Sequence, residues 1–306
     1  IEEAEEVGEV AVDTETTSLD PHQADLVGIS LCSKIGKACY IPVGHKSPKC
    51  LKKETVIKKL KKILEDPSIK KIGQNIKFDF IVFYKCGITL SSMEDTMLMS
   101  YVLDAGKNRH NMDTLSEIHL GHKTISFKEM VGTGKKEINF SEVELDKAKD
   151  YAAEDADVTF RLYKKFVKNL KSEKMINIYE IFEKPLIKIL AFMEIEGVEI
   201  DSKFLKSLSS KFEKKIQKLE KEVFKISKKE FNIASPKQLG EIIYNDLKIA
   251  GLKKTKKGSF ATSASVLEDL AFKGHEFPKL ILDWRQVSKL KNTYSDALPE
   301  HLNPNT

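Results

Sequence analysis

Cysteine and long apolar runs are both scarce in this chain of 306 residues. Its four cysteines show no C-x-x-C spacing, which argues against a disulfide framework and against a thiolate zinc site. No apolar run approaches the roughly 18–20 residues that a membrane span needs. The first six residues, IEEAEE, are acidic, whereas a secretion signal begins with basic residues. We therefore expect a reduced, cytosolic protein with no membrane segment.

Neither sign of charge dominates the whole chain, because the net charge is only +5. Hydrophobic residues make up 41%, which excludes global disorder, and the length suits two domains. Residues 1–170 hold 26 Lys+Arg against 27 Asp+Glu, whereas residues 171–306 hold 25 against 19. The basic second half is consistent with a polyanionic partner or, alternatively, with a solvated lysine surface.

The first half alternates between strand and helix patterns, which predicts an α/β layer domain. Asn75 is expected to cap the helix that follows a short buried strand. Strands are predicted over residues 8–15, 26–32, 38–43 and 70–74, and helices over 54–65, 93–103, 113–120 and 144–170.

Strand signals fade after about residue 175, so the second domain is expected to be mostly helical. Residues 202–229 carry apolar side chains every three or four positions, which fits a coiled-coil arm or, as we favour, one long antiparallel helix of a bundle. The other predicted features are a helix over 178–195 that Pro185 interrupts and Gly197 ends, a short strand over 198–200, a helix opening at Ser235, a basic loop over 253–259 and a helix over 277–298.

Asp13 and Glu15 stand two residues apart at the end of the first predicted strand. Because side chains alternate across a strand, they share a face with Ala11, while Val10 and Val12 point the other way. Neighbouring carboxylates repel each other unless a cation lies between them. This pair alone is a common pattern and a weak indication of a metal site.

Further carboxylates strengthen that indication. Asp79 lies in the first turn of a predicted helix, where a favourable interaction with the helix dipole is the alternative explanation. Tyr151 and Asp155 are four residues apart and share one helix face, whereas Asp157 falls on another face and is expected to be solvated or structural. Carboxylates without a His or Cys cluster form a hard oxygen set that suits Mg²⁺ or Mn²⁺.

Residues 12–16 (VDTET), 75–79 (NIKFD) and 151–155 (YAAED) resemble, in order and approximate spacing, the three exonuclease motifs of the DEDD superfamily. The tyrosine four residues before the last aspartate is that of the tyrosine subtype. This resemblance implies an α/β, ribonuclease H-like exonuclease domain over residues 1–172, in which helices flank a mixed central sheet.

Four blocks of the second half can be compared with known families: residues 183–201, 235–239, 262–267 and 285–294. They resemble the thumb of family A DNA polymerases, the family of bacterial DNA polymerase I. Residues 173–306 are therefore expected to be a helical thumb region. The palm carboxylates and the fingers have no counterpart, so the chain resembles a piece of a larger polymerase that should not extend a primer alone.

The resemblance also implies a two-metal 3′→5′ exonuclease with Mg²⁺ or Mn²⁺ as cofactor, which releases nucleoside 5′-monophosphates. Asp13, Glu15 and Asp155 would hold one ion, and Asp13 with Asp79 would hold the second. Tyr151 and Glu15 would orient the attacking water. A monomer acting on DNA in the bacterial cytosol or nucleoid is expected.

Contacts with DNA follow from the same resemblance. Thr16 and Leu19 would contact the terminal nucleotide of a single-stranded 3′ end, and Gln74 and Asn75 would position the strand, although ordinary turn and cap chemistry also explains these residues. A primer–template duplex would be gripped at the thumb by two side chains that lie four residues apart, Arg285 and Lys289.

Two alternatives stay open at this point. A ribonuclease D-like exoribonuclease shares the three motifs, but its second domain would be a compact RNA-binding module. An inactive exonuclease fold that serves only as a DNA-binding scaffold would release no mononucleotides.

Overall fold

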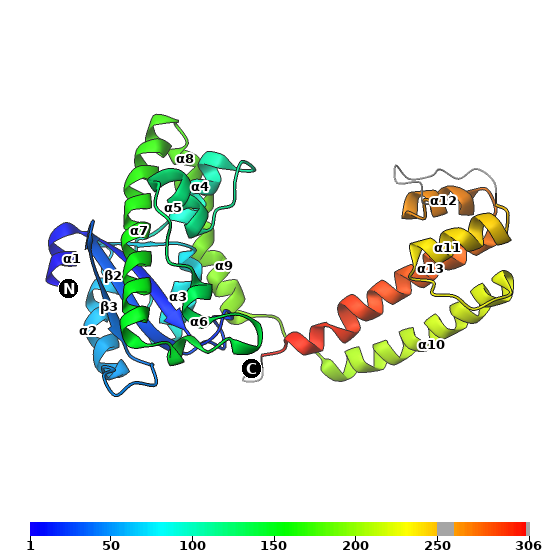
Figure 1. Cartoon of the computed structure of the whole chain (residues 1–306), viewed down its shortest axis with the longest axis horizontal. Coiled ribbons are helices and arrows are strands. Elements are labelled where there is room, and N and C mark those ends of the chain that lie inside the picture. Colours follow the sequence, from blue (N-terminus) through cyan, green and yellow to red (C-terminus); the bar gives the residue numbers. More distant parts are fainter. Residues whose placement is uncertain (250–259, 304–306) are drawn as a thin grey trace. The chain divides into compact units, whose positions relative to one another are not determined.

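The computed structural model describes residues 1–249 and 260–303, which belong to two compact units, Ile1–Gly197 and Val198–Thr306. The first unit is a mixed sheet covered by helices and the second is helical, so the predicted fold class is confirmed (Figure 1). Among the described helices, none has both the length and the apolar character that a membrane crossing requires. The basic loop predicted over 253–259 lies outside the described residues.

The sheet of the first unit has five strands within the described residues, in the order β3-β2-β1-β4-β5. The strand β1 runs antiparallel to β2 and parallel to β4, which places it at the centre of the sheet. The bounds are β1 (Glu9–Thr16), β2 (Leu26–Lys34), β3 (Lys37–Pro42), β4 (Lys70–Gly73) and β5 (Met93–Asp95).

Helices cover both faces of this sheet, and the alternation along β1 divides the core in two. Val10 and Val12 pack with α2 and α3, whereas Ala11 packs with α4, α5 and α7, as the sequence predicts. The helix bounds in this unit are α1 (Glu2–Val7), α2 (Lys53–Glu65), α3 (Ile76–Lys85), α4 (Thr96–Asp104), α5 (Met112–Leu120), α6 (Phe127–Val131), α7 (Leu145–Ser172), α8 (Ile176–Ile178) and α9 (Lys184–Glu196).

The helix predicted over residues 93–103 was wrong at its start. Met93–Asp95 is the edge strand β5, which pairs in parallel with β4, and helix α4 begins only at Thr96. The predicted cap of α3 was also wrong: Asn75 has the left-handed φ of 61° and makes no side-chain cap. The carboxylate of Asp95 accepts the hydrogen bonds from the amides of Asn75 and Ile76 instead.

The segment after α7 stays helical up to Gly197, as predicted. A π-helical turn, η3 (Tyr179–Glu183), precedes Pro185, which lies in the first turn of α9 where a missing N–H costs little. The strand predicted over 198–200 was wrong, because this stretch has no neighbouring strand to pair with in the described chain. Helix α9 packs against α3, so the first compact unit extends beyond the domain boundary expected after residue 172.

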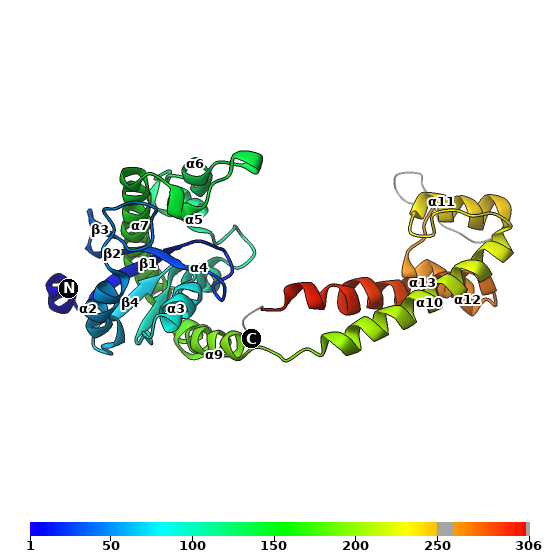
Figure 2. The same cartoon turned by 90° about the horizontal axis from the view of Figure 1, so that it is seen from below.

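The second unit is built on two long antiparallel helices, α10 (Ser202–Ser227) and α13 (Glu276–Leu290), which lie side by side in Figures 1 and 2. This confirms the favoured reading of the long heptad-like segment. Trp284 of α13 packs near Ile216 and Leu219 of α10 and donates a hydrogen bond to Glu220. The shorter helices are α11 (Pro236–Glu241) and α12 (Ala264–Phe272).

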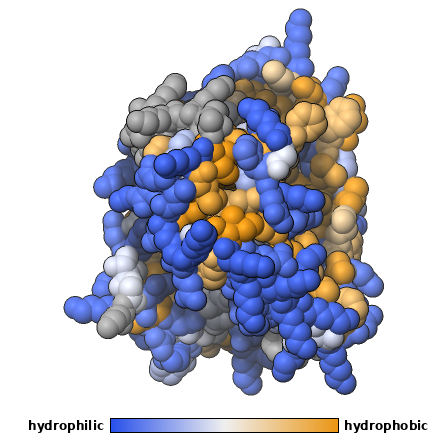
Figure 3. Space-filling model, turned by 90° about the vertical axis from the view of Figure 1, so that its right-hand side faces the viewer, coloured by the Kyte–Doolittle hydropathy of each residue, from blue (hydrophilic) through white to orange (hydrophobic). Residues whose placement is uncertain are grey.

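The hydropathy of the surface is shown for one side of the molecule. Figure 3 shows one face of the molecule, on which hydrophilic side chains surround a smaller hydrophobic area. The four cysteines, all within the described residues, are free.

Candidate active site

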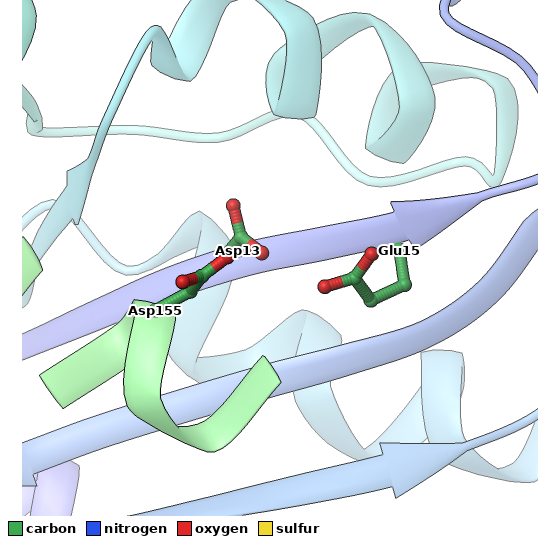
Figure 4. A group of neighbouring side chains, drawn as sticks. All are labelled: Asp13, Glu15 and Asp155. Atoms are coloured by element: carbon green, nitrogen blue, oxygen red, sulfur yellow. The ribbon is translucent and has the colours of Figure 1, made fainter. Parts of the chain in front are cut away.

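Two elements bring three of the predicted carboxylates together. Asp13 and Glu15 project from β1, and Asp155 projects from α7, which crosses the same face of the sheet (Figure 4). One carboxylate oxygen from each lies within 4.8 Å of the others. Glu15 and Asp155 are 140 residues apart in the chain and meet because α7 packs on β1 and β2.

Burial and mutual repulsion make this group costly in the absence of a cation. Burial raises the pKa of Asp13 to about 6. Burial and the charges of the neighbouring carboxylates raise the pKa of Glu15 and of Asp155 well above their usual values. The Oε1 atom of Glu15 is buried and, within the described residues, has no hydrogen-bond partner.

Asp79 reaches the same region from the first turn of α3 but does not belong to the three-carboxylate group. Its Oδ1 accepts hydrogen bonds from the backbone N–H of Thr14 (2.9 Å) and from the Thr14 hydroxyl (2.6 Å). Burial and the charge of Asp13 raise the pKa of Asp79, and the Thr14 hydrogen bonds oppose that rise. One oxygen of Asp79 is therefore committed to the strand that carries Asp13 and Glu15.

Tyr151 lies one turn before Asp155 on α7, and its hydroxyl donates a hydrogen bond to that carboxylate. Burial and the nearby carboxylates raise the pKa of Tyr151, so the phenol keeps its proton. Its ring packs 6.0 Å from the ring of Phe140, centroid to centroid. Tyr151 is thus a fixed donor at the edge of the carboxylate group.

One cavity of about 640 Å³ joins all the site residues predicted for the first domain. Leu19 projects into solvent at its rim with 87% of its surface exposed, and Asn75 is also exposed. The Thr16 hydroxyl donates to the carbonyl of Ser18. The predicted residues that line the cavity are Asp13, Glu15, Thr16, Leu19, Gln74, Asn75, Asp79, Tyr151 and Asp155.

The side-chain amide of Gln74 is already occupied by the protein. Its Nε2 donates to the carbonyl of His110 (2.8 Å), and its Oε1 accepts from the hydroxyl of Thr96. This arrangement ties the loop before α3 to the start of α4, so Gln74 shapes the cavity wall.

The cavity also has an apolar wall that the sequence analysis did not predict. Phe127 of α6 and Phe140 of the 3-10 turn η2 (Phe140–Glu142) stack with ring centroids 6.1 Å apart, and Ile138 lies between them in the chain. Asn139 ties this wall to the loop after β1 by donating to the carbonyl of Thr17. The only sequence signal is a pair of phenylalanines in an otherwise irregular, polar stretch.

Asp157, the neighbour of the site on α7, is structural and not solvated. Its carboxylate accepts hydrogen bonds from the backbone N–H of Gly36 and from the Nε of Arg161, both at 2.6 Å. These contacts fasten α7 to the turn between β2 and β3. Asp157 takes no part in the carboxylate group.

The two predicted thumb residues lie on α13 of the second unit. Arg285 is half-buried, donates to the carbonyl of Thr262 (2.7 Å), and burial lowers the pKa of its guanidinium. Lys289, one turn later, is exposed. Lys289 is thus the more accessible of the two, and Arg285 also braces the chain before α12.

The chemistry of the site fits a divalent cation. Three carboxylates with raised pKa values converge, an unpartnered oxygen of Glu15 is buried among them, and carboxylate oxygens are the ligands that Mg²⁺ and Mn²⁺ prefer. A cation at this point would relieve the mutual repulsion and supply the missing partner of Glu15.

Comparison with known proteins agrees with this chemistry. The chain is 44% identical to DNA polymerase I of Rhizobium leguminosarum and 41% identical to that of Pseudomonas aeruginosa, each over 100% of this chain. It spans only 32% and 34% of the length of those relatives.

A solved structure, the POL domain of Pol1 from M. smegmatis in complex with DNA primer-template and dNTP, has the same fold. The TM-score is 0.79 at 24% identity, over 97% of this chain and 47% of that one. A model of the 3′-5′ exonuclease family matches residues 1–171, and a model of DNA polymerase family A matches residues 202–306. The chain therefore belongs to the 3′-5′ exonuclease family, and its residues 202–306 are similar to DNA polymerase family A.

Proposed function

We propose that the first unit is a two-metal-ion 3′→5′ exonuclease that removes nucleotides from single-stranded or mispaired 3′ ends of DNA as nucleoside 5′-monophosphates. The observation that carries this proposal is the group of Asp13, Glu15 and Asp155, in which a buried oxygen of Glu15 has no partner among the described residues. The family match over residues 1–171 supports the same reaction.

Each side chain has a distinct role in the proposed reaction. Asp13, Glu15 and Asp155 would hold one divalent ion, and Asp13 with Asp79 would hold a second, directly or through water. When bound, such a pair lowers the pKa of an attacking water and neutralises charge on the leaving 3′ oxygen. The protonated hydroxyl of Tyr151 and the carboxylate of Glu15 orient that water toward the terminal phosphorus.

The cavity favours a single strand, because a volume of about 640 Å³ accommodates a terminal nucleotide but not a duplex. Leu19 at the rim and the apolar wall of Phe127 and Phe140 offer faces on which a base can pack. Thr16 and Asn75 would contact the strand through polar groups, and Gln74 would hold the wall between them in place.

The second unit would hold the duplex. Lys289 and Arg285 would contact backbone phosphates without reading the base sequence. We propose that residues 1–172 act as the exonuclease domain and residues 173–306 as the start of the polymerase region. In a longer protein, which would work as a monomer in the bacterial cytoplasm, this region would serve DNA-directed DNA synthesis, as the names of the relatives suggest.

The decisive experiment is digestion of oligonucleotides with a labelled 3′-terminal nucleotide by the purified chain in Mg²⁺ or Mn²⁺, with and without chelator. We expect mononucleotide release from single-stranded DNA and from a mispaired 3′ terminus, faster than from a matched duplex. Preferential digestion of a matched RNA strand would favour the exoribonuclease alternative. Binding of DNA without any metal-dependent release would favour the inactive scaffold.

A further inference from the structure

Asp95 is a buried carboxylate outside the candidate active site that serves two helices at once. It ends β5 with 1% of its surface exposed. Its Oδ1 accepts from the backbone N–H groups of Met97 (2.8 Å) and Leu98 (3.3 Å), which caps α4. Oδ1 also accepts from Asn75 (3.1 Å), and Oδ2 accepts from Ile76 (2.9 Å) at the start of α3.

The parallel pairing of β4 with β5 explains this double contact. Gly73 pairs with Asp95, so the end of β5 lies beside the start of α3. Helix N-termini carry unpaired N–H groups and partial positive charge, and one carboxylate satisfies both. Asn75 has the left-handed φ of 61°, a conformation that residues other than glycine seldom adopt, and the hydrogen bonds from the Asn75 and Ile76 amides to Asp95 hold it there.

Asp95 is itself held from the other side by Tyr179. The backbone N–H of Asp95 donates to the Tyr179 hydroxyl (2.9 Å), which in turn donates to Glu94 (3.0 Å). Lys184 of α9 pairs with the second oxygen of Glu94 at 2.6 Å. Because Tyr179 is completely buried, this network fixes the end of β5 in one position.

Helix α3 carries these constraints into the active site. Its first turn holds Asp79, whose Oδ1 bonds to Thr14 between Asp13 and Glu15. The residues just before the helix, Gln74 and Asn75, line the same cavity. A shift of the α3 N-terminus would therefore move every site residue that this helix and its preceding loop provide, and would leave those of β1 and α7 in place.

We propose that Asp95 is a positioning residue for the exonuclease site, and that Tyr179 keeps Asp95 in place. This inference rests on the proposed function. Asp95 touches neither the substrate nor the three-carboxylate group; it acts by fixing where α3 begins, and with it the distance between Asp79 and Asp13. The second metal position, which needs both aspartates, depends on it most.

The test compares Asp95→Asn, Asp95→Ala and Tyr179→Phe with a matched control, Tyr163→Phe. Tyr163 is also buried in the first unit, but its hydroxyl contacts Lys70 and Glu9 instead of β5. Three quantities are measured: amide hydrogen exchange over residues 74–80 and over α7, calorimetric Mn²⁺ binding without substrate, and kcat with the Mn²⁺ dependence of digestion.

For Asp95→Asn we expect amide exchange over residues 74–80 to become about tenfold faster, with exchange over α7 unchanged. Binding of the second Mn²⁺ should weaken about tenfold and kcat should fall about tenfold, because small misplacements of reacting groups cost about one to two orders of magnitude. Asp95→Ala should lose about 100-fold in kcat, and Tyr179→Phe about threefold, each with the same local change in exchange. Tyr163→Phe should change none of these.

A merely structural role would lower the active fraction or the melting temperature without moving the Mn²⁺ dependence. If Asp95→Asn and Tyr179→Phe leave local exchange and Mn²⁺ binding as in the wild type, the positioning role is wrong. If the wild-type chain digests no oligonucleotide, the proposed function fails instead, while exchange and Mn²⁺ binding still report on Asp95. Should Asp95→Ala not fold, Tyr179→Phe carries the test.

Discussion

The two units of the chain differ in whether they bury charged side chains. Within the described residues, the buried charged side chains all lie in the first unit: Glu15, Lys71, Asp79, Glu94, Asp95 and Asp155. The buried polar side chains of the second unit are uncharged hydroxyls, those of Ser227, Thr262, Ser288 and Ser295. Lysines of the second unit instead lie exposed along the outer face of α10.

This difference places the groups suited to chemistry in the first unit and leaves the interior of the second unit without buried charges in the described residues. Burying a charge costs several kcal/mol unless a partner compensates, so a fold that gathers carboxylates in one cavity gives up stability for a site. Lys71, Glu94 and Asp95 have hydrogen-bond partners, whereas Glu15 has an oxygen with none in the described chain. The described part of the second unit buries no charged side chain and so avoids this loss of stability, which suits the contact with backbone phosphates that we propose for it.

The largest expected loss of activity follows from the removal of a single carboxylate from the site. We expect Asp13→Ala to lower Mg²⁺-dependent digestion of a single strand by about 10³-fold or more, because both proposed ions share this ligand. The control Asp146→Ala removes a carboxylate from the exposed start of α7, where 86% of the side chain is accessible. Equal rates for Asp13→Ala and wild type would refute the nuclease assignment.

A smaller loss is expected from Tyr151→Phe, which keeps the ring against Phe140 and removes only the hydroxyl that bonds to Asp155. Misplacement of a reacting group costs up to about 100-fold, so kcat should fall by about 10–100-fold while Mn²⁺ binding stays near the wild-type value. A large loss of Mn²⁺ affinity would instead show that Tyr151 acts by holding Asp155.

The second unit should respond to charge removal in binding but not in chemistry. Arg285→Gln combined with Lys289→Gln is expected to weaken binding to a primer–template several-fold and to reduce the salt dependence by about two phosphate contacts. Digestion of a short single strand should be unchanged. The matched variant, Lys58→Gln with Lys59→Gln on the exposed face of α2, removes two charges from the first unit and should leave duplex binding as it is.

Local periodicity made much of the site predictable. The alternation along β1 put Asp13 and Glu15 on one face with Ala11, and the four-residue spacing on α7 put Tyr151 beside Asp155. Both follow from geometry within a single element. The long heptad-like pattern of α10 likewise revealed its packing along α13.

The remaining features of the site depend on contacts between distant parts of the chain and could not be predicted from local patterns. The three residues of β5 are too few to show a period, so its parallel partner β4 and the cap that Asp95 gives to α3 had no local signature. The wall of Phe127 and Phe140 comes from the short helix α6 and the 3-10 turn η2, which are too short to show a clear period in the sequence. The position of Asp79, bonded to Thr14, depends on both α3 and β1 and is visible only in the assembled fold.

The smallest expected effect concerns the buried cation of the first unit. Lys71 is completely buried and donates to the carbonyls of Asp66 and Ile69 and to the Ser91 hydroxyl. Burial lowers the pKa of Lys71 to about 8, whereas an unfolded lysine titrates near 10.4.

Between about pH 8 and pH 10.4 the unfolded chain therefore binds more protons at this residue than the folded chain does. The contribution of Lys71 to the free energy of unfolding should rise with pH across that window and be lowest below it. Melting curves recorded with chelator at about pH 7.5, below this window, and at about pH 9.5, inside it, compare wild type with Lys71→Met. The variant should lack this rise, a difference of a few degrees in melting temperature, while Lys218→Met on the exposed face of α10 should keep it. An equal pH response in wild type and Lys71→Met would mean that the buried amine is already compensated by its three acceptors.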